Sequence, residues 1–534
     1  MAAPLMERPT LVTTASLGPR YDEILTPAAL DFLRLLDDTV AAGRSAALAA
    51  RRERRRRLGS GAERLDFRPA TRSVREDPTW QVRPAPADLR DRRVEITGPP
   101  TPKMAINALN SGASGWMADF EDATTPTWSN VVEGQLTLVD AFDETLTHTA
   151  PDGRRYAVTG NLPAVHVRPR GWHLVEKHLQ LDGRPLSASV VDAGLFLFHC
   201  AQRQLDRGSG PYLYLPKLES ATEARLWRTL FEVAERALGL PCGSVRTTVL
   251  IETLPAAFEM EEILHALGPY ASALNAGRWD YLFSTIKTFS GGPPQVLPDR
   301  SSLTMDVPFL HAYTELLVAT CHRRGAHAIG GMAAFVPDRN DPERTAQALE
   351  RVRADKRREA GEGFDGSWVA HPGLVEACRE TFDAVLGSAP HQLDRTRDDV
   401  VVRAADLLDV TSAPGRPTAA GLRSAISVAL RYLAAWLGGS GAVAIDSLME
   451  DAATVEIVRA QLWQQVRAGT ELDDGSTVTA AHVTELVREQ AGRLAEGATA
   501  GLRLEQAAEL LVELACCPEF VPFFPPVAYA RHIA

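Results

Sequence analysis

Short apolar segments alternate with amphipathic helical patterns along the middle of this chain, from residue 91 to residue 388. The segments that we expect to form strands are residues 116–120, 164–168, 212–216, 248–252, 281–283, 327–330 and 368–370. Strands that alternate with helices usually pair as a parallel sheet, and this number of units favours a closed sheet. We therefore predict an α/β protein built around a (β/α)8 barrel.

The two ends of the chain have a different pattern, because helical spacing of apolar residues dominates there. In the first part, Thr26 fits a helix N-cap and Pro27 the first helical position. In the last part, residues 421–438, 449–467 and 480–494 read as helices. We predict three domains, which are an N-terminal helical domain (1–90), a barrel domain (91–388) and a C-terminal all-α domain (389–534).

The net charge of −11 argues against a protein that binds nucleic acids in general. One basic run, residues 51–57, has the composition of a nucleic-acid patch. Glu53 interrupts this run, and we interpret it instead as the solvated face of a helix. No nucleic-acid partner is expected.

The six cysteines are scattered, and their spacing indicates neither a zinc site nor a disulfide framework. No apolar run is long enough to cross a bilayer. Residues 1–9 lack the apolar core of a signal peptide. We therefore expect a cytoplasmic protein with reduced thiols and no membrane partner.

Several of the expected strands end in polar or charged residues, namely Asp119 and Glu121, Arg168, Lys217, Glu252 and His371. In (β/α)8 barrels the carboxyl ends of the strands converge on one face, where the chemistry takes place. Packing of an apolar core does not explain charges that recur at these positions. We expect them to face one shared pocket.

Two pairs of acids in this set suggest different roles. Asp119 and Glu121 are two residues apart on a strand, so they point to one face and need a cation or hydrogen-bond donors, unless they are solvated loop acids. Glu252 and Asp280 would end neighbouring strands, which lie about 5 Å apart. Two such carboxylates suit octahedral Mg²⁺, which would bind and polarise a 2-oxo acid.

Two further residues are candidates for catalysis. Arg168 would close its strand, where a guanidinium stabilises a developing enolate or alkoxide oxygen, although a structural ion pair is the alternative. Ser447 and Glu450 match a capping box that opens a helix, and this places Asp451 in the first helical turn. The helix dipole explains an acid there, and a general base delivered to the barrel mouth is the sharper interpretation.

Residues 103–128, 248–287, 330–335, 368–373 and 448–453 resemble the malate synthases, specifically the isoform A type, and the resemblance runs over nearly the whole chain. Residues 274–283, with the sequence LNAGRWDYLF, look like the family signature. The resemblance implies a TIM barrel with an N-terminal helical clasp and a C-terminal helical plug. It also implies a Mg²⁺-dependent condensation of acetyl-CoA with glyoxylate, followed by hydrolysis to malate and CoA in the glyoxylate bypass, by a monomer or weak homo-oligomer.

The same resemblance implies roles for individual residues. The catalytic pair would be Arg168 and Asp451, and the Mg²⁺ ligands would be Glu252 and Asp280. The residues implied to bind substrate are Gly277, Arg278 and Trp279, whose backbone amides would hold glyoxylate, Glu121, which would lie near the metal-bound waters, and Asp122, Ala123 and Pro372, which would lie near acetyl-CoA.

The alternative within enzymes is a malyl-CoA-type lyase or aldolase on a similar magnesium barrel. Residues 448–451 and the helical domain that contains them favour the synthase, because a small barrel lyase would not need this domain. Lys103 and Lys217 have two open interpretations, as phosphate or CoA contacts or as structural ion pairs.

Overall fold

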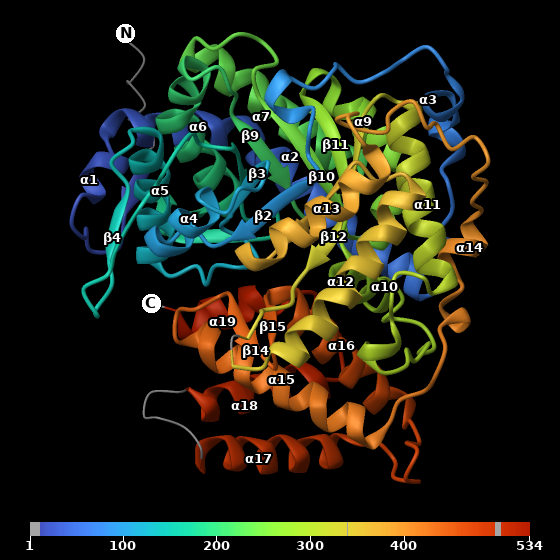
Figure 1. Ribbon diagram of the computed structural model, residues 1–534. Coiled ribbons are helices and arrows are strands. Elements are labelled where there is room, and N and C mark those ends of the chain that lie inside the picture. Colours follow the sequence, from blue (N-terminus) through green and yellow to red (C-terminus); the bar gives the residue numbers. More distant parts are fainter. Residues whose placement is uncertain (1–10, 339, 497–502, 534) are drawn as a thin grey trace, which may run out of the picture.

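The computed structural model describes residues 11–338, 340–496 and 503–533. Its centre is a closed barrel of parallel strands, with the bonded order β10-β11-β12-β13-β2-β3-β6-β9 (Figure 1). In chain order the barrel strands are β2 (Val94–Gly98), β3 (Gly115–Asp119), β6 (Ala164–Arg168), β9 (Tyr212–Leu215), β10 (Arg246–Ile251), β11 (Ala271–Ala276), β12 (His327–Ala333) and β13 (Gly366–Val369). The predicted (β/α)8 barrel is confirmed.

Six of the seven predicted strands overlap barrel strands, and the seventh is wrong. Residues 281–283 lie inside helix α10 (Arg278–Thr288), and the strand of that unit is β11. β11 has the sequence ASALNA, which is fully buried but contains no β-branched or aromatic residue to mark it as a strand. The prediction also omitted β2, which closes the ring between β13 and β3.

The inside of the barrel is filled by apolar and aromatic side chains, namely Met117, Tyr214, Leu250, Ala273, Ile329 and Trp368. At its amino-terminal end a buried ion pair joins Arg92 and Glu95, with Nε and Oε1 2.6 Å apart. Arg92 also donates to the hydroxyl groups of Thr248 and Tyr214 on other strands. The inside of the barrel is therefore a packed core. In barrels of this kind the reactive groups lie on the loops at the opposite end.

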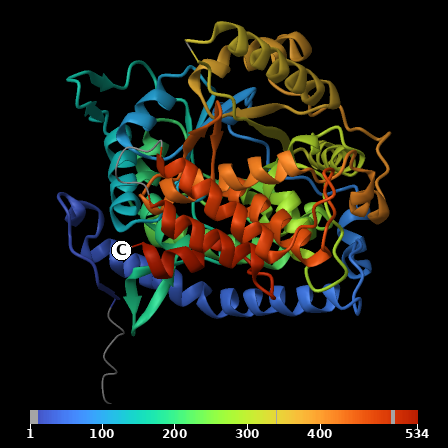
Figure 2. The same ribbon diagram turned by 90° about the horizontal axis from the view of Figure 1, so that it is seen from below.

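The N-terminal helix α2 (Pro27–Gly59) lies along the outside of the barrel against α6 (Ala188–Asp206) and α7 (Ala221–Leu238) (Figure 2). Thr26 caps it, since its hydroxyl accepts a hydrogen bond from the amide of Ala29, as predicted. Other elements of this half of the molecule are β1 (Leu11–Thr13), α1 (Tyr21–Ile24), α3 (Arg72–Glu76), α4 (Pro102–Leu109), α5 (Trp128–Phe142), β4 (Thr147–Thr149), β5 (Arg155–Ala157), β7 (Val175–Leu181) and β8 (Arg184–Ser187).

The basic run at the end of α2 is only partly a solvated face. The side chain of Arg56 is 68% exposed and pairs with Glu53, as that interpretation requires. The side chain of Arg51 is 9% exposed, and its guanidinium bonds to Glu223 of α7. The interpretation is therefore wrong for Arg51, because this arginine joins α2 to the barrel.

Helices α15 (Ala419–Leu437), α16 (Ala452–Ala468), α17 (Ala480–Glu496), α18 (Leu504–Cys516) and α19 (Phe524–His532) share a hydrophobic core of their own. They cover the end of the barrel at which the strands finish, and α16 packs on α10 (Figures 1 and 2). The remaining helices are α8 (Leu254–Ala257), α9 (Met260–Leu267), α11 (Pro308–Arg323), α12 (Pro342–Glu362), α13 (Val375–Leu386) and α14 (Ala404–Leu408). The expected clasp and plug are both present.

The predicted capping box of α16 is wrong. Ser447 lies with Asp446 in the turn of a hairpin formed by β14 (Val443–Ile445) and β15 (Leu448–Glu450), and both turn residues have positive φ. This is the geometry of a two-residue hairpin turn. α16 begins only at Ala452, with Asp451 as its N-cap.

None of the described helices is long and apolar enough to span a membrane. The expectation about residues 1–9 falls outside the residues that the structure describes. The boundaries that we predict after residues 90 and 388 stay predictions.

Candidate active site

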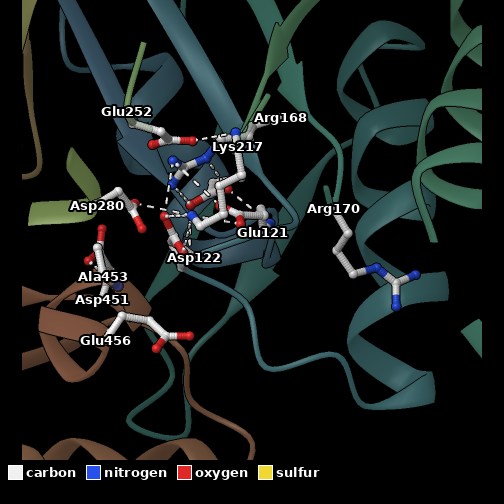
Figure 3. A network of polar contacts seen from close by, with 12 residues as sticks. Glu121, Asp122, Arg168, Arg170, Lys217, Glu252, Asp280, Asp451, Ala453 and Glu456 are labelled. Atoms are coloured by element: carbon white, nitrogen blue, oxygen red, sulfur yellow. Dashed lines mark hydrogen bonds and ion pairs between the residues drawn. The ribbon is translucent and has the colours of Figure 1, made fainter. Parts of the chain in front are cut away.

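Charged side chains from consecutive strand–helix units meet at the carboxyl end of the barrel (Figure 3). Asp119 and Arg168 are the last residues of β3 and β6, and Lys217 and Glu252 follow β9 and β10 closely. Asp280 was expected at a strand end, but it lies in the first turn of α10. It still faces the same pocket, because α10 starts directly above the end of β11.

Arg168 is held by carboxylates on one side and an aromatic ring on the other. Its Nε lies 2.7 Å from Asp119 Oδ1 and its Nη2 2.5 Å from Asp119 Oδ2. Its Nη1 lies 3.3 Å from Asp122 and 3.7 Å from Glu121. The guanidinium carbon is 5.7 Å from the ring centre of Trp368. This two-point contact with Asp119 fixes the plane of the guanidinium.

Asp119 also organises the turn that follows β3. Its Oδ1 accepts a hydrogen bond from the amide of Glu121, and its Oδ2 accepts one from the amide of Ala123. Asp119 and Glu121 are both buried, so neither is a solvated loop acid. The compensation that such a pair requires comes from Arg168 and Lys217.

Lys217 occupies the centre of the acidic cluster. Its Nζ lies 2.8 Å from Glu121, 2.9 Å from Asp122 and 3.1 Å from Asp280. Its backbone amide donates to Glu252 Oε1 at 2.6 Å, and its φ of 53° is in the left-handed region. Lys217 is therefore an ion-pair partner of the acidic cluster.

The acids of this cluster are buried, and their pKa values are shifted in different directions. Burial and the neighbouring Asp122 raise the pKa of Glu121 well above its usual range, and burial does the same to Glu252. Burial raises the pKa of Asp280 to about 6. For Asp122 the opposing effect of burial is outweighed by Lys217 and Arg168, which hold its pKa at about 2.

Asp122, Glu252 and Asp280 each offer one carboxylate oxygen, and these three oxygens lie within 4.8 Å of one another. The buried Oδ1 of Asp280 has no hydrogen-bond partner among the described residues. Carboxylate oxygens are the ligands that Mg²⁺ and Ca²⁺ prefer. The structure thus brings together the two acids predicted as metal ligands, and it adds Asp122 to them.

Asp451 enters the same region from the C-terminal helices (Figure 3). As the N-cap of α16 it accepts a hydrogen bond from the amide of Ala453 at 3.2 Å. The amide of Ala452 and the hydroxyl of Tyr432 both donate to the carbonyl of Asp122, so this helix start rests on the barrel turn. Burial, followed by the charge of Asp122, raises the pKa of Asp451 well above its usual range.

A cavity of about 770 Å³ joins these groups, and Arg168, Glu252, Asp280 and Asp451 all line it. Gly277, Arg278 and Trp279 line it as well. They form the N-cap and first residues of α10, where free amides and the helix dipole favour an anion. The amide of Gly277 already donates to the hydroxyl of Tyr313 at 3.0 Å, which leaves the next amides of the helix to meet a ligand.

The other predicted site residues lie further out. Ala123 lines a small adjoining cavity together with Asp451. Pro372 opens a single helical turn after β13 and lines neither of these two cavities. Lys103 is exposed near the ring of Tyr156, and it lines neither cavity either. Arg170 points away from the cluster and pairs with Asp192 and Glu176, so its role is structural (Figure 3).

Comparison with known proteins supplies the family context. Family models described as the N-terminal domain, the TIM barrel domain and the C-terminal domain of malate synthase match residues 11–73, 164–410 and 416–531. The malate synthase of Streptomyces clavuligerus is 54% identical over 99% of both chains. The malate synthase of Myxococcus xanthus is 50% identical over 98% of this chain and 96% of its own. Malate synthase A of Escherichia coli is 43% identical over 97% of both chains.

Proposed function

The chain belongs to the malate synthase family, and on this premise we propose how its residues divide the condensation of acetyl-CoA with glyoxylate and the hydrolysis to malate and CoA. The observation that carries the proposal is the single cavity lined by Arg168, Asp451 and the acidic cluster. A cation-binding group, an oxyanion-stabilising group and a general base are the parts that this reaction needs.

We propose that Asp122, Glu252 and Asp280 hold Mg²⁺. The close approach of their oxygens and the unpartnered Oδ1 of Asp280 support this assignment. When bound there, the ion supplies a Lewis acid that polarises the aldehyde of glyoxylate. Lys217 and Arg168 already balance part of the negative charge. Glu121, which contacts both, would lie near the metal-bound waters.

The carboxylate of glyoxylate would lie at the start of α10. The amides of Arg278 and Trp279 are the first of that helix, and the position of both residues in the cavity wall supports a role in orienting the substrate. Gly277 allows the close packing that this position needs, because a Cβ there would lie 2.9 Å from Glu252 Cβ.

Asp451 would remove a proton from the methyl group of acetyl-CoA. Burial and the charge of neighbouring Asp122 raise the pKa of Asp451, which supports a carboxylate that is a stronger base. Arg168, which lines the same cavity, would stabilise the enolate oxygen. The turn Asp122–Ala123, with Pro372 beyond it, would contact acetyl-CoA.

The enolate carbon then attacks the aldehyde, and water hydrolyses the thioester of the product. The malyl-CoA-type lyase is not favoured, because the match to the malate synthase C-terminal model places the chain with the synthases. We further propose that the protein acts in the cytoplasm as a monomer or weak homo-oligomer. We also retain domain boundaries after residues 90 and 388.

The test is release of free thiol from acetyl-CoA, followed with a thiol reagent while glyoxylate and Mg²⁺ are each present or omitted. We expect release that requires both. A folded protein that releases no thiol under any condition would contradict the proposal. Cleavage of malyl-CoA to acetyl-CoA and glyoxylate without thiol release would identify the lyase instead.

A further inference from the structure

A second cavity, of about 280 Å³, lies where the three parts of the molecule meet. One wall is the end of α2, another is the segment before and at the start of α19, and the floor is formed by α8, the end of α10 and two barrel loops. It shares no lining residue with the active-site cavity. The reaction proposed above leaves this cavity without a role.

The lining of this cavity carries a surplus of positive charge. The cationic residues that line it are Arg51, Arg52, Arg54, Arg55 and Lys287, and the one carboxylate among its lining residues is Glu219. Within the described residues, no carboxylate oxygen lies within 4.0 Å of the guanidinium of Arg52 or of Arg55. Protein groups therefore leave two of these charges without an ion-pair partner.

Buried polar atoms at the same place also lack partners. Nη1 of Arg51 and Nδ1 of His173 are buried and have no hydrogen-bond partner among the described residues. A buried polar atom without a hydrogen bond costs free energy, so native proteins usually satisfy it. Burial lowers the pKa of Arg55 and of Lys287, the charges of neighbouring arginines lower it further, and Glu219 opposes both effects.

The rest of the lining is apolar. It consists of Leu48, Leu58, Pro255, Val521, Pro522, Phe523, Pro526 and Val527. Phe523 stacks on the ring of His173 with ring centres 3.9 Å apart, and Lys287 Nζ lies 4.1 Å from the centre of the Phe523 ring. The cavity thus combines a positive end with an apolar wall.

We propose that this cavity binds a small organic anion with a carboxylate or phosphate head and a short apolar body. The head would pair with Arg52 and Arg55, the two lining arginines without an ion-pair partner among the described residues. The body would contact the apolar side chains of α2 and of the segment before α19. The volume sits near the lower end of the range of about 300–1,000 Å³ for ligand pockets, which restricts the ligand to a small molecule.

This site is physically joined to the active site through one side chain. Nη2 of Arg51 donates to the backbone carbonyl of Lys217 at 2.7 Å, while its other contacts are Glu223 and Glu219. Arg51 therefore links the lining of this cavity to the backbone of Lys217. The proposal concerns binding alone and does not depend on the reaction assigned to that cluster.

The test compares neighbouring arginines of one helix. Arg55→Gln removes a cavity-lining charge, and Arg56→Gln removes an exposed charge that pairs with Glu53 outside the cavity. The melting temperature of each protein is measured in sodium phosphate, in sodium butyrate and in sodium chloride of equal ionic strength. At about ten times its dissociation constant, a bound anion should raise the melting temperature by about 1 °C.

We expect phosphate or butyrate to raise the melting temperature of wild type and of Arg56→Gln, with a smaller rise or none for Arg55→Gln. A response to phosphate alone identifies a phosphorylated ligand, and a response to butyrate alone a carboxylate. Anion binding at the active site cannot produce this result, because Arg55→Gln leaves that site intact. The proposal is overturned if neither anion exceeds chloride, or if Arg55→Gln responds as wild type does. If Arg55→Gln does not fold, Arg52→Gln replaces it, because Arg52 is an exposed residue.

Discussion

Asp451 has two roles, and its substitution by asparagine can separate them. Its side chain caps α16 through the amide of Ala453, and its carboxylate lines the active-site cavity. Asparagine is about as good an N-cap as aspartate, but it is not a base. The capping interaction and the proposed proton transfer can therefore be tested independently.

We predict that Asp451→Asn lowers kcat for glyoxylate-dependent thiol release by about 10²- to 10⁴-fold, the usual contribution of a general base. Its melting temperature should match or exceed that of wild type, because a buried carboxylate is removed and the cap is retained. Thermal unfolding and the thiol assay measure the two effects.

The matched control is Asp446→Asn, a half-exposed acid of the preceding hairpin turn whose carboxylate pairs with Arg431. It should retain wild-type kcat. If Asp451→Asn turns over at the wild-type rate, Asp451 is not the base.

His322 is a buried ion-pair partner remote from the active site, and it should make stability depend on pH. Its Nε2 lies 3.1 Å from Asp365, and its Nδ1 lies 2.7 Å from the carbonyl of Arg395. Burial opposes protonation, but these partners outweigh it and raise the pKa of His322 above the usual value of 6.5. The charged form is thus favoured in the folded protein more than in the unfolded chain.

It follows that the stabilisation by His322 is fully present below pH 6.5 and is lost as the pH rises through the raised pKa. We predict that His322→Gln destabilises the protein by about 1.5–3 kcal/mol at pH 5.5, as for a hydrogen bond to a charged group, and by less at pH 9. Denaturant unfolding at both pH values measures this. His482→Gln, at a histidine outside this ion pair, is the control. An equal effect of His322→Gln at both pH values would contradict the raised pKa of His322.

At the scale of elements, the sequence predicts the barrel well and its details unevenly. Alternating apolar segments locate six barrel strands, because each has bulky residues that mark it. β11 has mostly small residues and no β-branched or aromatic one, and its neighbour 281–283 is more apolar, so the pattern wrongly predicts a strand within helix α10. The S-x-x-E pattern before α16 likewise wrongly predicts a capping box. Asp446 and Ser447 form a hairpin turn there instead.

The active site, like the fold, is predicted in outline but not in detail. Charges that follow strands predict most of the residues that converge, and Lys217 and Asp122 both follow strands. The prediction is wrong for His371, which lines neither the active-site cavity nor the small adjoining one and instead accepts a hydrogen bond from the amide of Gly373. The pattern does not predict which cation pairs with which acid, since this depends on how side chains from β3, β9 and α10 cross the pocket. The central position of Lys217 and the approach of Asp122 to Glu252 and Asp280 therefore emerge only from the structure.

The junction between β11 and α10 allows a test of an element boundary. Gly277 packs so closely on Glu252 that an added Cβ would lie 2.9 Å from Glu252 Cβ. We predict that Gly277→Ala displaces Glu252 and weakens Mg²⁺ activation by about 10- to 100-fold, as for other residues that orient a metal ligand. The concentration of Mg²⁺ that gives half-maximal thiol release measures this effect.

Gly361→Ala is the matched control, because Gly361 lies inside α12 and a Cβ there meets nothing within 4 Å. It should stabilise the protein by about 0.5–1 kcal/mol and leave Mg²⁺ activation unchanged. Unchanged Mg²⁺ activation in Gly277→Ala would show that the packing at Gly277 does not position Glu252.

At the scale of the whole molecule, the active site lies at the interface between the barrel and the C-terminal helices. The acidic cluster belongs to the barrel, whereas Asp451 belongs to helices with a separate core. The two parts are joined by α16 on α10 and by the bonds from Ala452 and Tyr432 to the Asp122 carbonyl. Binding at the acidic cluster should therefore stabilise the folded assembly as a whole.

We predict that Mg²⁺ at about 100 times its dissociation constant raises the free energy of unfolding by about 2.7 kcal/mol relative to EDTA. Asp280→Asn should lose most of this gain, because it removes one of three ligands, and Asp446→Asn should keep it. Melting curves with Mg²⁺ and with EDTA measure the difference. A gain that is the same in wild type and Asp280→Asn would place the cation elsewhere.

The hydrogen bonds between β2 and β13 that complete the ring have a consequence for how the protein is made. A ribosome releases β2 early and must synthesise every other barrel strand before β13 can reach it. Until then the nascent chain carries an open sheet edge, which is prone to pair with other chains and is a natural substrate for chaperones. Asp451 emerges later still, so all barrel strands are synthesised before the proposed base.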